Sequence, residues 1–304
     1  MDEGRFSVTA LVNAYVRAHH ALYVAPKIFD DPIARRLFTD DQFSEIGKKL
    51  AAGLPFFNPQ LAASCSDEAT ALALVMRDHN APIPLSRARY CEDELAAAVK
   101  RGVRQYVILG AGMDTFAFRR PADMQHLHVF EVDHPSTQEL KRFQVARLEA
   151  EAPAQVSFVP LDFSKESLQA ALLKPPYDPD ALTFVNWSGV TYYLDRDTVF
   201  ETLRALAAVV PAGSTLVFDY LDPDAFIAEK AALRVQRMLE ITRRIREPMK
   251  TSFDPPALPA QLARTGWRLA ADFNPSDIEQ RYFQGRSDGY HAFEHVHFAR
   301  AVKA

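Results

Sequence analysis

Three features that the sequence lacks narrow its class. Only two cysteines, Cys65 and Cys91, occur among 304 residues, which favours a reducing cytosol over a disulfide-stapled scaffold. No apolar run approaches 18 residues, so no helical membrane span is expected. The 35 basic and 39 acidic residues give a net charge of −4, which leaves no electrostatic footprint for nucleic acid. We therefore expect a cytoplasmic protein without a nucleic-acid or membrane partner.

The composition is that of a globular protein with a sizeable core, since 48% of the residues are hydrophobic and 24% are charged. The first ten residues, MDEGRFSVTA, are acidic and lack the apolar centre of a secretory signal. A chain of this length forms one large α/β domain or two smaller ones. Internal repeats are absent, and nothing in the sequence indicates the oligomeric state.

The stretch 102–135 carries the clearest pattern in the chain. Residues 106–109 form a continuous apolar run, typical of a strand buried on both faces of a parallel sheet. Gly110 and Gly112 follow, and without Cβ atoms they let the backbone turn sharply and approach a ligand. After a short helical segment, a second strand ends in Asp133, 23 positions beyond Gly110. An acid at roughly 20 residues binds the ribose hydroxyls in nucleotide-binding βαβ units, so we infer an adenosine-containing cofactor.

Two cofactors compete for this pattern. A dinucleotide requires a third glycine for close helix packing, and Thr115 occupies that position. Asp114 also places a negative charge where a pyrophosphate would lie. S-adenosylmethionine has no phosphate and carries a sulfonium and an amino group, so an acid in the turn costs it little. The motif therefore favours S-adenosylmethionine over a dinucleotide.

Strands and helices alternate through the middle of the chain. Predicted strands end at Gly110, Asp133, Asp162, near Gly189 and at Asp219, at intervals of 23 to 30 residues. Helices are predicted between them at 136–150, 165–173 and 196–210. This alternation predicts an α/β fold with a parallel, doubly wound sheet. Ligands bind at the carboxyl ends of strands in such sheets, which is where Gly110, Asp133, Asp162 and Ser188 fall.

The flanking regions lack this alternation. Residues 1–90 are predicted to be helical and irregular, with a break at 80–85, and form an N-terminal cap over the ligand site; the alternative is a packing extension with no role there. Residues 91–304 form the cofactor-binding core. Within it, one long helix is predicted at 222–246, in a second cap segment at about 222–256. The final strands are predicted at 267–273 and 295–301, the latter an exposed, histidine-rich edge strand rather than a metal site.

Five segments together resemble the bacterial leucine carboxyl methyltransferase-like superfamily: LGAGMDT (109–115), FEVDHP (130–135), VPLDF (159–163), GVTYYL (189–194) and RYFQGR (281–286). Its members are S-adenosylmethionine-dependent O-methyltransferases, related to protein phosphatase methyltransferases and to polyketide-tailoring carboxyl methyltransferases. The resemblance runs from about Ser7 to the C-terminus. It implies the class I methyltransferase fold, a Rossmann-like doubly wound sheet of seven strands, the last antiparallel, with helical additions over the site.

The resemblance also implies roles for individual residues. Gly110, Ala111 and Gly112 would line the methionine moiety, Asp133 would bind the ribose, and Asp162 with Leu161 or Phe163 would meet the adenine. Arg87, with Arg89 as the alternative match, resembles an arginine that pairs with the cofactor carboxylate or the substrate. Arg17 resembles a basic residue that closes the same pocket. Many relatives carry glutamate where this chain has Ser188, so the partner of the methionine amino group is unassigned.

Methyl transfer from a sulfonium is an in-line displacement that depends on alignment and exclusion of water. A carboxylate nucleophile is ionised at neutral pH and needs no base, and no Ser/His/Asp or Cys/His arrangement is evident. We therefore expect methylation of a carboxylate. The resemblance implies that the acceptor is a small molecule of secondary-metabolite type and that Tyr193 contacts it. A hydroxyl acceptor would need a general base, for which His134 is poorly aimed. A catalytically idle binding protein with this fold is the remaining alternative.

Overall fold

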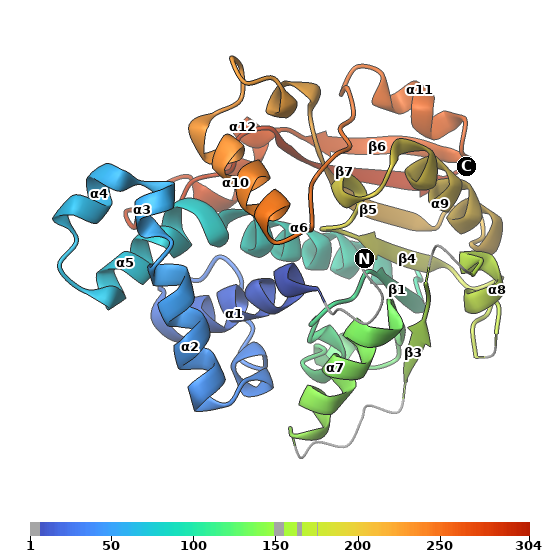
Figure 1. Ribbon diagram of the computed structural model, residues 1–304. Helices are drawn as coiled ribbons and strands as arrows, with labels where there is room; N and C mark the ends of the chain where they lie inside the picture. The colour runs from blue at the N-terminus through green and yellow to red at the C-terminus, as the bar shows by residue number, and fades with distance from the viewer. Residues whose placement is uncertain (1–6, 149–154, 163–165, 175) are drawn as a thin grey trace.

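A seven-stranded sheet forms the centre of the computed structural model, which describes residues 7–148, 155–162, 166–174 and 176–304 (Figure 1). The strand order is β3-β2-β1-β4-β5-β7-β6, and β7 alone runs antiparallel to its neighbours. The strands are β1 (Gln105–Leu109), β2 (His128–Asp133), β3 (Val156–Pro160), β4 (Thr183–Trp187), β5 (Thr215–Leu221), β6 (Trp267–Phe273) and β7 (Val296–Lys303). This is the predicted class I methyltransferase fold.

Helices cover both faces of the sheet, which explains the apolar runs in its strands. All five residues of β1 are buried, and successive side chains point to opposite faces. Tyr106 and Ile108 pack into one core with α1 (Val8–Tyr23) and α6 (Pro82–Val99). Val107 and Leu109 join the other core. The helices that contribute to that second core are α8 (Leu168–Leu172), α9 (Arg196–Val209) and α11 (Leu258–Ala263).

The chain reverses its direction of progress across the sheet between β1 and β4. From β1 it proceeds outward through β2 to β3, and β4 then pairs with the opposite edge of β1. Such a reversal opens a crevice beyond the carboxyl ends of the two central strands. The first connection, from β1 to β2, contains only the 3₁₀ turns η3 (Phe116–Phe118) and η4 (Ala122–Met124), whereas α7 (Pro135–Ala146) connects β2 to β3.

The N-terminal helices gather beside the sheet, at the blue end of the colour scale in Figure 1. After α1 come η1 (Ala34–Leu37), α2 (Asp40–Ala51), α3 (Leu54–Phe57), α4 (Pro59–Ser64), α5 (Glu68–Val75) and the π-helix η2 (Met76–Asn80). The helix α6 begins at Pro82 and crosses the predicted domain boundary at residue 90. The break predicted at 80–85 was therefore too long, because proline is tolerated in the first turn of a helix.

Two further predictions about the C-terminal third were wrong. Residues 222–246 are not one helix: Asp222 accepts hydrogen bonds from the backbone N–H groups of Asp224 and Ala225 and caps the short η6 (Pro223–Phe226), and α10 (Leu233–Arg244) follows a turn. The histidine-bearing strand β7 is not an edge strand, because it lies between β5 and β6. His297 is accordingly buried and stacks on Tyr220. The chain completes this part with α12 (Pro275–Ile278) and the π-helix η7 (Glu279–Phe283).

Both cysteines are free thiols, and Cys91 is buried. The cytoplasmic location predicted from the scarcity of cysteine stays a prediction. Among the residues that the structure describes, no helix combines the length and apolar character needed to span a bilayer.

Candidate cofactor and substrate site

The turn after β1 brings the backbone to the mouth of the crevice. The N–H groups of Gly110 and Ala111 both donate to the carbonyl oxygen of Val132, at 2.8 and 3.1 Å, so the chain turns away from the sheet immediately. Gly110 has φ +78°, and a Cβ there would lie 2.5 Å from Val190 Cγ2. Only glycine fits this position without displacing the side chain of Val190.

Asp133 is the last residue of β2, and its carboxylate is fixed by two backbone groups. Oδ2 accepts from the N–H of Gly112 at 2.5 Å, and Oδ1 accepts from the N–H of His134 at 2.6 Å. Burial raises the pKa of Asp133, and the two N–H groups partly oppose that rise. A carboxylate has about four acceptor sites, so this group retains capacity for two ligand hydroxyls.

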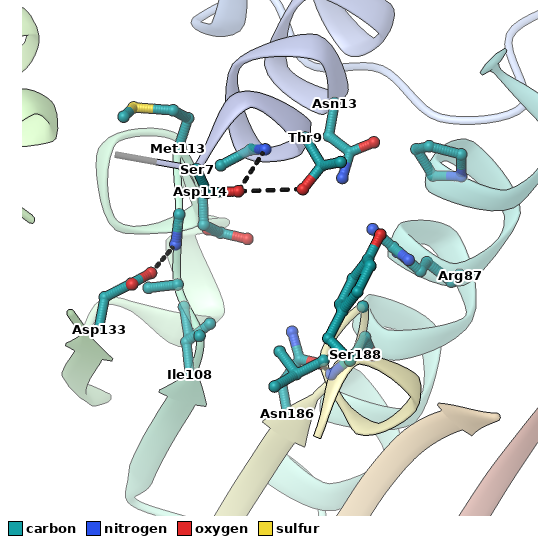
Figure 2. A pocket seen from close by; sticks show the side chains of 18 of the residues that line it. Ser7, Thr9, Asn13, Arg87, Ile108, Met113, Asp114, Asp133, Asn186 and Ser188 are labelled. Atoms are coloured by element: carbon teal, nitrogen blue, oxygen red, sulfur yellow. Dashed lines mark hydrogen bonds between the residues drawn. The ribbon is translucent and has the colours of Figure 1, made fainter. Parts of the chain in front are cut away.

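These groups line a cavity of about 710 Å³, shown from close by in Figure 2. The structure brings ten of the predicted site residues to its wall: Arg17, Arg87, Gly110, Ala111, Gly112, Asp133, Leu161, Asp162, Ser188 and Tyr193. Phe163 lies outside the described residues. Arg89, the alternative to Arg87, is absent from the wall; it is half-exposed and pairs with Asp93 at 2.8 Å.

The helix α1 covers the glycine turn. A Cβ on Gly112 would approach the Cβ of Ala10 to 3.1 Å, so the helix rests almost directly on the turn. Arg17 Nη2 donates to the carbonyl oxygen of Met113 at 2.6 Å, and Arg17 Nε donates to Asp31 Oδ2 at 2.9 Å. The guanidinium therefore ties the N-terminal helix to the turn that is predicted to line the cofactor.

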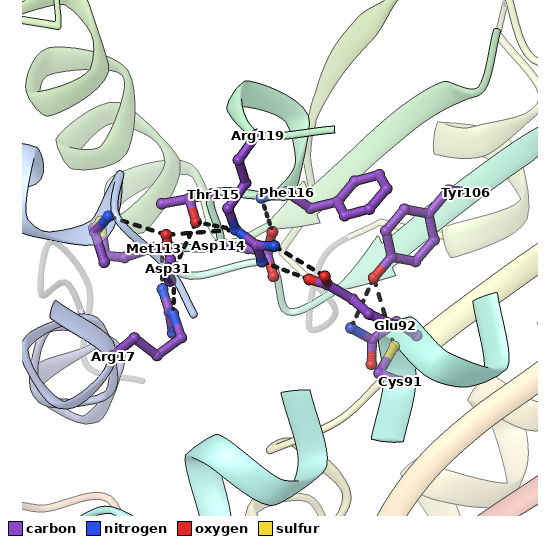
Figure 3. Close-up of polar contacts among 12 residues, drawn as sticks. Arg17, Asp31, Cys91, Glu92, Tyr106, Met113, Asp114, Thr115, Phe116 and Arg119 are labelled. Carbon is purple, nitrogen blue, oxygen red and sulfur yellow. Dashed lines mark hydrogen bonds and ion pairs between the residues drawn. The ribbon is translucent and has the colours of Figure 1, made fainter. Parts of the chain in front are cut away.

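A buried ion network continues from Arg17 beneath the turn (Figure 3). Asp31 is fully buried and also accepts from Thr115 Oγ1 at 2.6 Å, while Arg119 Nε lies 3.4 Å from its Oδ1. Arg119 in turn forms a bidentate pair with Glu92 on α6, at 2.9 and 2.5 Å. Burial acts to raise the pKa of Asp31, but Arg17, Arg119 and the Thr115 hydroxyl together hold it below its ordinary value.

Arg87 reaches the cavity from α6 and is held from behind. Its Nη1 donates to the Tyr192 hydroxyl at 2.8 Å and to Asp219 Oδ2 at 3.2 Å. Asp219 also accepts from the N–H of Gly189 at 2.6 Å and does not line the cavity. Asp219 thus orients Arg87 and the turn after β4 from behind the cavity wall.

Tyr193 lies in η5 (Thr191–Tyr193) and lines the cavity. Its ring meets that of Tyr192 edge to face, with centroids 4.8 Å apart. Burial raises the pKa of Tyr193 well above its usual value. The hydroxyl therefore remains protonated at neutral pH and can donate a hydrogen bond but cannot act as a base.

The segment after α10 closes the remaining side. Glu247 accepts hydrogen bonds from the N–H groups of Val8 and Thr9, at 2.8 and 3.3 Å, and from Thr9 Oγ1 at 2.5 Å. Lys250, also on the wall, pairs with Asp195 at 2.9 Å. The second cap segment and the N-terminal helix thus meet over the cavity.

Sequence reasoning missed several residues of this wall. Asn13, Glu92, Arg119, Asn186, Glu247 and Lys250 all line the cavity and were not predicted. Arg119 lies in the same connection as the glycine motif, four residues beyond Thr115, and its proximity to the motif was an available signal. Glu247 offered none, because its partner lies about 240 positions away in the sequence.

The sheet order, the glycine turn and the acid at the end of β2 define a class I α/β methyltransferase. A family model described as leucine carboxyl methyltransferase matches residues 10–207. A Bacillus subtilis (strain 168) protein described as "Putative S-adenosyl-L-methionine-dependent methyltransferase YktD" is 38% identical over 304 residues, covering 100% of both chains. A Mycolicibacterium paratuberculosis protein described as "Putative S-adenosyl-L-methionine-dependent methyltransferase" is 34% identical over 238 residues. The match covers 75% of this chain and 80% of the relative.

Two solved structures share the fold. A DUF574 family protein from Streptomyces avermitilis superposes with a TM-score of 0.61 at 14% identity, covering 99% of each chain. A protein from Thermobifida fusca whose title reads "putative methyltransferase" gives a TM-score of 0.55 at 16% identity, covering 99% of this chain and 96% of the other. The chain belongs to the leucine carboxyl methyltransferase family, and it is an S-adenosylmethionine-dependent methyltransferase.

Proposed function

We propose that the protein transfers the methyl group of S-adenosylmethionine to a carboxylate on a small molecule of secondary-metabolite type. The observation that carries this proposal is the lack of a placed base. Among the described residues of the cavity wall, His134 is the one histidine. Its Nδ1 lies 2.8 Å from Ser136 Oγ and its Nε2 lies 3.9 Å from Asp162, at the predicted adenosine end.

Several other ionisable groups of the wall are also unsuited to removing a proton. Tyr193 stays protonated at neutral pH because burial raises its pKa. Glu92 pairs with Arg119, Asp195 pairs with Lys250, and Glu247 caps α1. A carboxylate acceptor has an ordinary pKa near 4 and is already ionised at pH 7, so it can attack without such a base. A hydroxyl acceptor could not.

The residues of the cavity fit the cofactor in chemistry and space. The bound cofactor supplies a methyl group activated by the sulfonium. The chain's own residues bind and orient: Asp133 accepts from the ribose hydroxyls, Leu161 and Asp162 flank the adenine, and the glycine turn passes beside the methionine moiety. Arg87 pairs with its carboxylate. These assignments, with Arg17 and Ser188 completing the wall, are proposals based on position.

The two cap segments supply the substrate side of the cavity. Residues of α1 and the segment 246–250 meet beside it through Glu247, and we propose that this contact helps to exclude water from the reacting atoms. The division into a cap at 1–90, a core at 91–304 and an insertion at about 222–256 is proposed on the same basis. Tyr193, with its protonated hydroxyl facing this space, is proposed to hold the acceptor in line with the methyl group.

The test is a matched-pair assay with S-adenosylmethionine. Small aromatic and polyketide-like carboxylic acids would be offered beside the corresponding primary alcohols, with methyl esters and ethers detected by mass spectrometry. We expect esters only, with a rate that is flat between about pH 6 and 9 because no base titrates. Tyr193→Phe should lower kcat/KM by roughly tenfold, about 1.4 kcal/mol, and leave S-adenosylhomocysteine affinity unchanged; Arg89→Ala is the control. Ether formation would contradict the proposal, as would cofactor binding without turnover on any acid.

A further inference from the structure

The α-amino group of the bound cofactor requires an anionic partner, and Ser188 cannot provide one. A serine hydroxyl carries no charge, and the N–H of Ser188 is already held by Asn186 Oδ1 at 3.1 Å. Hydrogen bonds between ionised groups are roughly twice as strong as neutral ones. A buried ammonium without a carboxylate would pay a desolvation cost that a neutral hydroxyl does not offset.

Asp114 is placed to meet this need. It follows Gly112 by two residues and lines the cavity, and Figure 2 shows it on the glycine-turn side, facing the side that carries Ser188 and Arg87. Its Oδ1 accepts from the N–H of Phe116 at 2.7 Å, which closes the turn and orients the side chain. The carboxylate is therefore preorganised by one oxygen while its group faces the ligand space.

The other acids on the wall either pair with a cation or a helix end, or lie at the positions proposed for the ribose and adenine. Glu92 forms its bidentate pair with Arg119, and Asp195 pairs with Lys250. Glu247 accepts from the amino end of α1, and Asp133 accepts from two backbone N–H groups at the ribose position. Asp162 lies beside His134 beyond the end of β3, at the adenine position. Asp114 remains, on the glycine turn that we propose passes beside the methionine moiety.

The negative charge of Asp114 acts on several groups around the cavity. Burial acts to lower the pKa of Arg119, but Glu92, Asp31 and Asp114 together raise it. Burial raises the pKa of Glu92 and of Tyr106, and the negative charge of Asp114 adds to both rises. Arg87 supplies a cation on the facing wall, where its guanidinium lies so close beneath Gly189 that a Cβ there would be 2.7 Å from Nη2. An anion on one wall and a cation on the other complement the zwitterionic end of an amino acid.

We propose that Asp114 binds the α-ammonium group of S-adenosylmethionine, the role that Ser188 leaves open, while Arg87 faces the carboxylate of the same moiety. This rests on the proposed function only in its choice of cofactor, and is independent of the methyl acceptor. On this proposal the glycine turn contributes a charged side chain to binding of the amino-acid end, in addition to the close approach of its backbone.

The test is calorimetry with three ligands on the full chain: S-adenosylhomocysteine, its des-amino analogue in which hydrogen replaces the amine, and 5′-methylthioadenosine, which lacks the amino-acid end. The wild type should bind S-adenosylhomocysteine roughly 10- to 100-fold more tightly than the des-amino analogue, the range expected for a charged hydrogen bond. In Asp114→Asn, which keeps an oxygen for Phe116, this ratio should fall to near one, while 5′-methylthioadenosine affinity stays within about twofold.

Two controls separate a binding role from a structural one. Ser188→Ala should leave the ratio unchanged, and the unfolding midpoint of Asp114→Asn should match that of the wild type. An unchanged ratio in Asp114→Asn would overturn the proposal. So would an equal loss of all three ligands, which would mean that Asp114 only shapes the turn. Failure of the proposed function would look different, because the wild type would then bind the ligands but form no ester.

Discussion

At the scale of single residues, the orientation of Asp133 is set by the backbone before a ligand arrives. The N–H groups of Gly112 and His134 hold one oxygen each. Asp133→Ala should weaken binding of 5′-methylthioadenosine by about 1–3 kcal/mol, the worth of hydrogen bonds to a charged acceptor. Adenine, which has no ribose, should bind the variant and the wild type equally in the same titration. If the variant loses the same affinity for both ligands, the substitution acts by disturbing the fold and not by removing a contact to the ribose.

A second single-residue effect concerns a fully buried ion pair outside the cavity. Lys141 on α7 pairs with Glu131 Oε2 on β2, both about 1% exposed, and Glu131 Oε1 has no hydrogen-bond partner. Lys141→Met should lower the free energy of unfolding by about 3–5 kcal/mol because it strands a buried carboxylate. The double variant Glu131→Leu/Lys141→Met should recover most of that loss in urea denaturation.

The exposed pair Glu45–Lys49 provides the matched control for this prediction. Both side chains are more than two-thirds exposed, so Lys49→Met should leave the unfolding midpoint unchanged. A double variant no more stable than Lys141→Met would show that the pair, and not the stranded charge, carries the stability.

Site residues that lie within one sequence motif could be predicted. Site residues that only folding brings together from distant segments could not. Gly110 and Asp133 follow from local pattern because a buried strand, a turn and a second strand fix their places within 23 positions. Residues 30–33, two acids followed by proline and isoleucine, are typical of a helix start. That pattern gives no sign that Asp31 binds Arg17 and Arg119. The burial of Asp31 depends on three segments coming together, and no local spacing encodes that.

At the scale of elements, α1 depends on a residue from the far end of the chain for its N-terminal capping. Ser7 Oγ accepts a hydrogen bond from the N–H of Ala10. Glu247 accepts hydrogen bonds from the N–H groups of Val8 and Thr9. A carboxylate at a helix N-terminus also interacts favourably with the helix dipole. The contact therefore joins helix stability to closure of the cavity.

Glu247→Ala should lower the free energy of unfolding by about 1 kcal/mol, as for loss of a capping side chain, and should speed hydrogen exchange at Val8 and Thr9. Glu247→Gln, which keeps an acceptor without charge, should lie between. The control is Glu240→Ala on α10, where a surface pair with Arg244 is removed and neither readout should change measurably. If the hydrogen-exchange rate at Val8 is the same in the wild type and in both Glu247 variants, the capping role is contradicted.

Helices and strands were predicted correctly where the hydrophobic spacing agreed with residues that end an element. The predicted strand at 267–273 matches β6 residue for residue, because Gly266 and Asn274 bound an apolar segment. The long helix predicted at 222–246 failed because apolar spacing continues through a region in which the Asp222 side chain caps a separate turn. Local hydrogen bonds by short polar side chains compete with helix formation, and hydrophobic spacing does not register them.

At the scale of the whole molecule, the ion network beneath the glycine turn joins the N-terminal helices to the core. Arg17 and Asp31 come from the first segment, Arg119 from the β1–β2 connection and Glu92 from α6. Because the network is buried, separating the two regions would expose unpaired charges. We expect cap and core to unfold in one cooperative transition.

The pH dependence of stability tests this connection. The folded state lowers the pKa of Asp31 below its ordinary 3.8, so its ionised form contributes stability above about pH 4, which is lost as the pH falls through the lower folded value. Asp31→Asn should cost about 3 kcal/mol at pH 7, and the difference from wild type should shrink toward pH 3. A difference that stays constant over this range would show that the charge of Asp31 is not what stabilises the fold.

The position of β7 constrains the order in which the sheet can be completed. The strand β6 precedes β7 along the chain, yet it bonds to the sheet only through β7, which is inserted between it and β5. During synthesis β6 therefore emerges with no edge to join, and β5 keeps an open edge until a later segment fills it. Open strand edges invite pairing with other chains, so we expect the nascent protein to be most prone to wrong pairing along β5 during that interval.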